Sequence, residues 1–136
     1  MVAATGTTLM DLNGIGPSGA ARLLVEVDDI TRFPDNNHFG SWTGTAPIDA
    51  SSGDNVRHRL SRGGNYQINQ VLRITAIVQL RNPTEGRAYF DRTRARGNTS
   101  NESMRLLKRR LSDIVYRTMV NDAARHMATA PGGQRL

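Results

Sequence analysis

The chain has 136 residues, with 18 Lys and Arg against 12 Asp and Glu, and no cysteine. This length suits one domain with its own core, and the lack of cysteine excludes disulfides and thiolate metal sites, while the three histidines do not have the spacing of zinc ligands. The N-terminal segment lacks the basic and apolar regions of a signal peptide, and no apolar run approaches the ~20 residues of a membrane span. We therefore expect a soluble, cytoplasmic protein with no membrane partner.

The net charge of +6 is unevenly distributed along the chain. Residues 1–50 carry two Arg and six acidic residues, a charge of −4, whereas residues 51–136 carry fifteen Arg and one Lys against six acidic residues, a charge of +10. A half this basic is typical of a protein that binds phosphate, and arginine suits bidentate contacts to phosphate oxygens and guanine edges. Codon usage in a GC-rich genome would also enrich arginine, so the charge favours nucleic-acid binding without establishing it.

The first predicted element is a short amphipathic helix that follows a glycine-rich turn. In "LNGIGPSGAARLLVEV", Pro17 suits the first turn of a helix, and the apolar residues after it follow helical spacing. Gly14, Gly16 and Gly19 form the pattern G-x-G-x-x-G. No strand pattern precedes these glycines, which argues against a dinucleotide-binding fold.

Two interpretations of the glycine turn stay open. In the first, the turn belongs to a helix-hairpin-helix, where Gly14 and Gly16 let the backbone approach a DNA phosphate at the positive N-terminus of the helix. In the second, it is a tight turn that places Ile15 in the core and binds no ligand. Acidic residues nearby, Asp11 among them, favour the second interpretation.

Residues 43–64, "TGTAPIDASSGDNVRHRLSRGG", are rich in Gly, Ser, Asp and Arg and predict an extended loop or a loose hairpin with no core of its own. Two longer amphipathic helices are expected after it. The first begins after the N-cap Asn65 and ends before Pro83. The second runs roughly over residues 102–127, with Leu107 and its apolar neighbours on the core face and arginines on the other face.

The predicted fold is therefore mainly α, with one compact domain in four segments. Residues 1–42 form the helix-hairpin-helix-like segment, residues 43–64 the serine-bearing loop, residues 65–128 the basic helical part, and residues 129–136 a tail that we expect to be disordered.

Basic residues of the helical part form the predicted nucleic-acid surface, because cations contact the phosphate backbone regardless of base sequence. They are Arg92, Arg94, Arg96, Arg105, Lys108, Arg109 and Arg110. A solvated basic face without a ligand is the alternative. Tyr89 and Phe90 could stack on unpaired bases, although "AYF" is more typical of packing between helices.

The chain resembles the C-terminal domain of one transposase family in the order of three segments: "LNGIGPSGAARLLVEVDDITRF", "FGSWTGTAPIDASSGDNVRHRLSRGGNYQINQVLRITA" and "RAYFDRTRARGNTSNESMRLLKRRLSDIVYRTM". The family comprises the serine-dependent insertion-sequence transposases with an N-terminal RuvC-like domain, family one-ten, also called bridge recombinases. The likeness runs from about Leu12 to Met119. Thr45 stands where an apolar residue is usual, and Asn69 and Gln70 replace a customary arginine pair.

The resemblance implies that the chain helps to join DNA ends, with Ser52 as the nucleophile. It also implies a structured guide RNA that selects the target by base pairing. Arginine donors would stabilise the charge on the attacked phosphorus, and a glycine would allow close backbone approach. The residues expected to support Ser52 in this way are Ser51, Gly53, Arg57, Arg59 and Arg62.

No cofactor or metal site is expected in this chain, because the resemblance assigns Mg²⁺ to the acidic cluster of the RuvC-like domain, which would act in cis or in trans. The expected partners are DNA, guide RNA and that domain, and a homo-oligomer is compatible with the sequence. We expect the chain to be a fragment or truncated form that binds nucleic acid without cutting it. The alternative function is a non-catalytic helix-hairpin-helix module that binds nucleic acid, and a second alternative is an RNA-binding accessory protein.

Overall fold

The computed structural model describes residues 7–45 and 65–129, and these two ranges are mainly helical. In chain order the elements are η2 (Leu9–Asp11), α1 (Pro17–Val27), η3 (Ile30–Arg32), α2 (Asn36–Thr43), α4 (Tyr66–Leu80), α5 (Glu85–Ala95) and α6 (Ser100–Thr129). The elements η2 and η3 are short 3-10 turns, and neither described range contains a β-strand. The predicted mainly α fold is confirmed.

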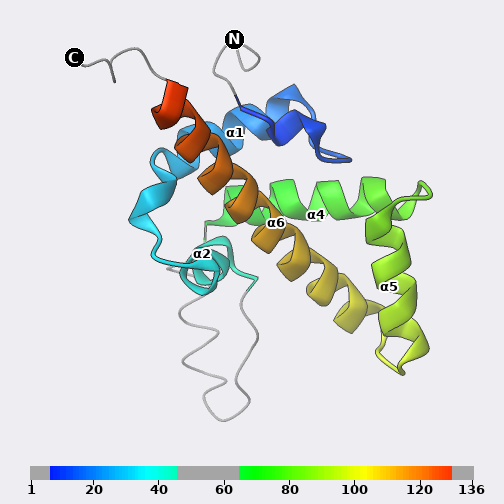
Figure 1. Ribbon diagram of the computed structural model, residues 1–136. Coiled ribbons are helices and arrows are strands. Elements are labelled where there is room, and N and C mark those ends of the chain that lie inside the picture. Colours follow the sequence, from blue (N-terminus) through cyan, green and yellow to red (C-terminus); the bar gives the residue numbers. More distant parts are fainter. Residues whose placement is uncertain (1–6, 46–64, 130–136) are drawn as a thin grey trace.

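The longest helix, α6, is the element against which most of the others pack. Its 30 residues extend about 45 Å at 1.5 Å per residue. It contacts α2, α4, α5, η2 and η3, and Figure 1 shows it running diagonally across the molecule. Leu107, Leu111, Val115 and Met119 recur every four residues along it and are all buried. This is the apolar face that the sequence predicted for the last helix.

The core fills the space between this face of α6 and the shorter helices. Helix α1 contributes Leu23 and Val27, α2 contributes Phe39, and α4 contributes Ile68 and Leu72, all of them fully buried. No helix in the described ranges is both long and apolar enough to cross a membrane.

The predicted helix starts are confirmed for α1 and α4. Pro17 is the first residue of α1, and Asn65 caps α4 by accepting a hydrogen bond at Oδ1 from the backbone N–H of Ile68 at 2.9 Å. Since α4 ends at Leu80, it also stops before Pro83 as predicted.

Two helices lie where the sequence analysis expected none. The first, α2, starts at the cap Asp35, which accepts from the N–H of His38 at 2.9 Å. The second, α5, makes the basic part a set of three helices instead of two, and its fully buried positions are Gly86 and Thr93. Each helix has only two large apolar residues in or against the core, Phe39 and Trp42 in α2 and Tyr89 and Phe90 in α5. Two residues are too few for periodicity to reveal a helix.

The glycine turn packs closely against α4. Gly14 has a φ of 92°, and a Cβ at this residue would lie 2.9 Å from the carbonyl oxygen of Thr75. The carbonyl of Asn13 accepts a hydrogen bond from Gln79 Nε2 at 2.7 Å. Ile15 is buried, as the tight-turn interpretation predicts.

Gly16 has a different role from Gly14. It is the N-cap of α1 with a φ of −91°, and no atom outside its neighbours lies within 4 Å of the position of a Cβ. The backbone therefore requires glycine at position 14 but not at position 16. A helix-hairpin-helix has a helix on each side of its hairpin. The element before the glycine turn, η2, is a 3-10 turn of three residues, so the helix-hairpin-helix stays a prediction.

We expect Gly14→Ala to lower the free energy of unfolding by about 1–3 kcal/mol, because alanine would hold a strained backbone and crowd α4. Gly16→Ser is the matched control and should leave stability nearly unchanged, since serine is a favoured N-cap residue. Urea unfolding followed by circular dichroism measures both. Equal losses in the two variants would contradict this account of the turn.

Candidate nucleic-acid interface

The exposed arginines at the C-terminal end of α5 are the most accessible part of the predicted basic surface. Arg92, Arg94 and Arg96 are all exposed, and none of the three forms an ion pair with an acidic side chain in the described ranges. Arg94 Nη1 donates to the carbonyl of Asn98 at 3.1 Å, which holds its side chain near the end of the helix. These three guanidinium groups are therefore available to an external anion.

Arg110 is partly committed to contacts inside the molecule. Its guanidinium lies 4.8 Å from the centre of the Tyr89 ring, and Nη2 lies 3.9 Å from Oε1 of Glu85. Tyr89 and Phe90 are half-buried and pack against the core. The "AYF" segment thus packs α5 against its neighbours, as one of the two interpretations predicted.

Arg109 connects α6 to α2. Its Nε donates to Oδ1 of Asp113 at 2.9 Å, and its Nη2 donates to Oδ1 of Asn37 at 2.7 Å. A Cβ at Gly40 would lie 2.9 Å from Nη1, so the guanidinium lies directly on the α2 backbone. Only 18% of the Arg109 side chain is exposed. Arg109 therefore helps to hold α2 on α6, and its contact with nucleic acid stays a prediction.

Lys108 lies at the junction of α6, α4 and the end of α2. Its Nζ donates to Oδ1 of Asn69 at 3.1 Å, and Asn69 Nδ2 donates to the carbonyl of Thr43 at 2.9 Å. Burial lowers the pKa of Lys108, and the nearby positive charges of Arg73 and Arg105 lower it further. The structure therefore brings the predicted Arg105 and Lys108 together with Arg73, which the sequence analysis did not select.

The predicted serine site lies outside the described residues. Its members are Ser51, Ser52, Gly53, Arg57, Arg59 and Arg62. The two residues that flank this segment are described. Asn65 donates its backbone N–H to the carbonyl of Trp42 at 2.5 Å, and Thr45 donates its own to the carbonyl of Gly40 at 2.9 Å. Thr45 and Asn65, the described neighbours of residues 46–64, therefore both lie at the end of α2, near Asn69.

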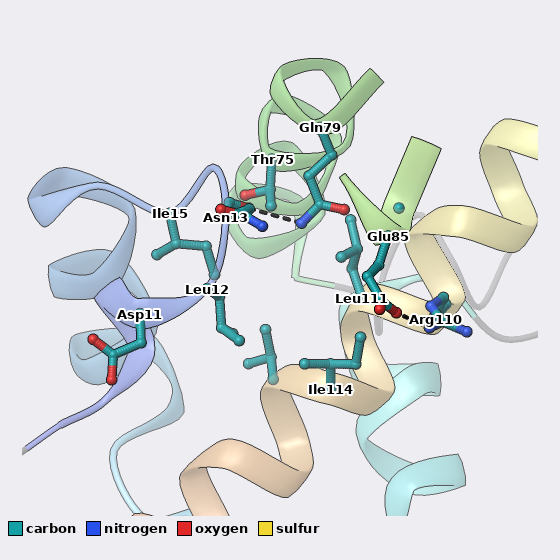
Figure 2. Close-up of a pocket in the computed structure, with 12 residues that line it drawn as sticks. Asp11, Leu12, Asn13, Ile15, Thr75, Gln79, Glu85, Arg110, Leu111 and Ile114 are labelled. Carbon is teal, nitrogen blue, oxygen red and sulfur yellow. Dashed lines mark hydrogen bonds and ion pairs between the residues drawn. The ribbon is translucent and has the colours of Figure 1, made fainter. Parts of the chain in front are cut away.

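A cavity of about 250 Å³ lies between the glycine turn, α4, α5 and α6. Figure 2 shows its apolar wall, which includes Leu12 and Ile114, and the ion pair between Glu85 and Arg110 on another side. A second hollow, of about 540 Å³, lies between the start of α1 and α4. The described ranges contain no group of three or more His, Cys, Asp or Glu that could hold a metal ion.

Comparison with known proteins identifies the relatives of this chain. Residues 6–91 match the family described as "Transposase IS116/IS110/IS902 family". The chain is 35% identical over 129 residues to "Insertion element IS110 uncharacterized 43.6 kDa protein" of Streptomyces coelicolor, covering 94% of this chain and 32% of the relative. It is 29% identical over 118 residues to "Putative transposase y4pF/y4sB" of Sinorhizobium fredii, covering 86% of this chain and 28% of the relative.

A third relative is "Insertion element IS900 uncharacterized 42 kDa protein" of Mycobacterium paratuberculosis, 27% identical over 114 residues, with 82% of this chain and 28% of the relative covered. The chain thus spans about a third of the length of these relatives. No solved structure matches it.

The different roles of two arginines four positions apart give a stability test. We expect Arg109→Gln to lower the free energy of unfolding by about 1–3 kcal/mol, because Asp113 and Asn37 lose a charged hydrogen-bond partner. Arg105→Gln, the control, should change it by no more than about 0.5 kcal/mol, because Arg105 is exposed. Thermal and urea unfolding of both proteins measure the change in stability. A larger loss of stability in Arg105→Gln than in Arg109→Gln would show that Arg105, and not Arg109, holds the helices together.

Proposed function

Because the chain belongs to the IS116/IS110/IS902 family of transposases, we propose that it is the part of a transposase that binds DNA and supplies Ser52 as the nucleophile of strand transfer. In this proposal it acts with a structured guide RNA and with a RuvC-like domain, joined in cis or supplied in trans. The observation that supports the proposal is the position of Thr45 and Asn65, the described neighbours of the serine-bearing segment, which are hydrogen-bonded to the end of α2, where Asn69 connects α2 to Lys108.

The exposed arginines of α5 support the DNA-binding part of the proposal. Arg92, Arg94 and Arg96 carry fixed positive charges that no described carboxylate neutralises by an ion pair. Such charges bind backbone phosphates without reading the base sequence. A domain that carries a nucleophile to DNA needs contacts of this kind to hold the strand, whatever its sequence.

The chemistry assigned to Ser52 is a transesterification. The serine oxygen forms a bond to phosphorus while the bond from phosphorus to a sugar oxygen breaks; the hydroxyl loses its proton, and the leaving sugar oxygen gains one. Arg57, Arg59 and Arg62 follow Ser52 closely in the sequence and would offset the negative charge that builds up on the phosphoryl oxygens. We assign Mg²⁺ to the RuvC-like domain.

The DNA-binding proposal predicts a strong dependence on salt. The affinity for duplex DNA should fall with salt, and replacing Arg92, Arg94 and Arg96 together by Gln should flatten the plot of log K against log salt by about 0.9 for each phosphate that the variant no longer neutralises. Arg22→Gln on α1 is the control and should leave the slope almost unchanged. Fluorescence anisotropy at several salt concentrations measures the slope. If the affinity of the wild type for DNA does not change with salt, these arginines do not bind DNA phosphates.

The role of Ser52 predicts a covalent protein–DNA adduct when the chain is combined with a RuvC-like domain, guide RNA and Mg²⁺. Ser52→Ala should abolish the adduct on a denaturing gel and keep the DNA affinity within a few fold, since one hydroxyl adds little to binding by arginines. Ser51→Ala is the matched control and should have a milder effect.

An adduct that persists in Ser52→Ala and disappears in Ser51→Ala would move the nucleophile by one residue. If neither substitution affects an adduct formed by the wild type, the segment has no nucleophilic role. DNA binding would then support the alternative, a non-catalytic nucleic-acid-binding module.

A further inference from the structure

We propose that Lys108, Arg73 and Arg105 form a binding site for a single phosphate group at the junction of α4 and α6. We call it the junction site. The proposed function makes a nucleic-acid backbone the source of that phosphate, and to this extent the inference rests on it.

The ammonium group of Lys108 is held in place by contacts from two helices. Nζ donates one hydrogen bond to Asn69 Oδ1, and Asn69 is in turn fixed by its bond to the Thr43 carbonyl at the end of α2. An ammonium has three N–H donors. Among the described residues, Lys108 Nζ donates only the bond to Asn69, which leaves two of its N–H donors without a partner in this part of the chain.

The junction site is rich in positive charge that the described part of the chain does not neutralise. Arg73 lies four residues from Asn69 on α4, and Arg105 lies three residues from Lys108 on α6, so the hydrogen bond between Lys108 and Asn69 brings both arginines to the same junction. Both arginines are exposed, and their charges lower the pKa of the half-buried Lys108. No ion pair joins any of the three to a described carboxylate, whereas Arg109, on the next turn of α6, is paired with Asp113. Like charges held together are unfavourable unless an anion neutralises them. A phosphate bound between them would turn this repulsion into attraction.

The residue type at position 108 also fits this role. Lys108 is the single lysine of a chain that uses arginine for its other 17 basic residues. A compact ammonium on a flexible stem can reach a half-buried position beside Asn69, where a planar guanidinium would need more room. The two exposed arginines can contribute the fork-shaped donors that suit phosphate oxygens.

The position of the junction site gives it a use in the proposed function. Asn69 connects Lys108 to the last turn of α2, and the segment 46–64 begins shortly after α2 ends and rejoins the body at Asn65. A backbone phosphate bound by Lys108 would therefore be held beside the points where the serine-bearing segment is anchored. The junction site would act in positioning the strand, and it would touch no reacting atom.

Because the chain has one lysine, the side-chain signal of Lys108 can be followed by NMR in protein labelled with ¹³C-lysine. Inorganic pyrophosphate should shift this signal saturably and raise the pKa of Lys108, since an anion favours the charged form. The double variant Arg73→Gln/Arg105→Gln should bind pyrophosphate about tenfold more weakly or worse, as expected for the loss of charged hydrogen bonds. Arg117→Gln removes an exposed charge elsewhere on α6 and should stay within about twofold of wild type.

The absence of a saturable shift in the wild type would overturn the junction site, and so would an equal affinity in the double variant, provided that circular dichroism shows both proteins folded. Lys108→Met is then compared with Arg117→Gln for binding to a DNA duplex and to an RNA hairpin. Weaker binding to one of them by Lys108→Met alone supports the proposal and identifies the source of the phosphate. If Lys108→Met matches Arg117→Gln on both, the assignment to nucleic acid is wrong. If the wild type binds neither, the proposed function fails, and the pyrophosphate titration still decides the site.

Discussion

The burial of one face of α6 is the constraint on which the rest of the structure depends. Leu107, Leu111 and Val115 form a continuous apolar stripe, and the shorter helices complete the core around it. Helix α2, with eight residues, is too short to be stable by itself. It is held on α6 by the buried ring of Phe39 and by Thr43, whose hydroxyl lies 3.2 Å from that of Ser112. The end of α2, from which the serine-bearing segment departs, is therefore as fixed as the core of the domain.

The basic residues on and around this helix divide into two groups with different physical roles. Arg109 and Arg110 have partners inside the molecule, Asp113 and Glu85, and help to join helices to one another. Arg92, Arg94 and Arg96 at the C-terminal end of α5, and the three cations at the junction of α4 and α6, form no ion pair with a carboxylate in the described ranges. The net charge therefore overstates the number of basic side chains that can bind a polyanion. The structure shows that Arg109 and Arg110 are paired inside the molecule.

The sequence revealed those parts of the fold whose causes are local. Helices α1, α4 and α6 have apolar stripes, and Pro17 and Asn65 mark helix starts in the sequence itself. Helix α5 buries Gly86 and Thr93, and only the half-buried Tyr89 and Phe90 add apolar area, so its sequence contains no long apolar period to detect. The candidate site was harder to predict, because the contact of Lys108 with Asn69 and that of Arg109 with Asn37 join residues far apart in the chain. The one hint in the sequence is that Lys108 is the single lysine among the basic residues. This sets Lys108 apart from the arginines, but it does not reveal that Asn69 is its partner.

The anchoring of residues 46–64 has an evolutionary consequence. Asn65 and Thr45 are both hydrogen-bonded to the last turns of α2, at Trp42 and Gly40, so the chain returns to the place that it left. The entropic cost of closing a loop grows only with the logarithm of its length, by about 0.6 kcal/mol for each doubling. The length of chain between Thr45 and Asn65 therefore has little effect on the closure entropy. Selection can change that length while the two hydrogen bonds to α2 stay the same, so the spacing of these two anchors along the sequence is free to differ between relatives that share the helical body.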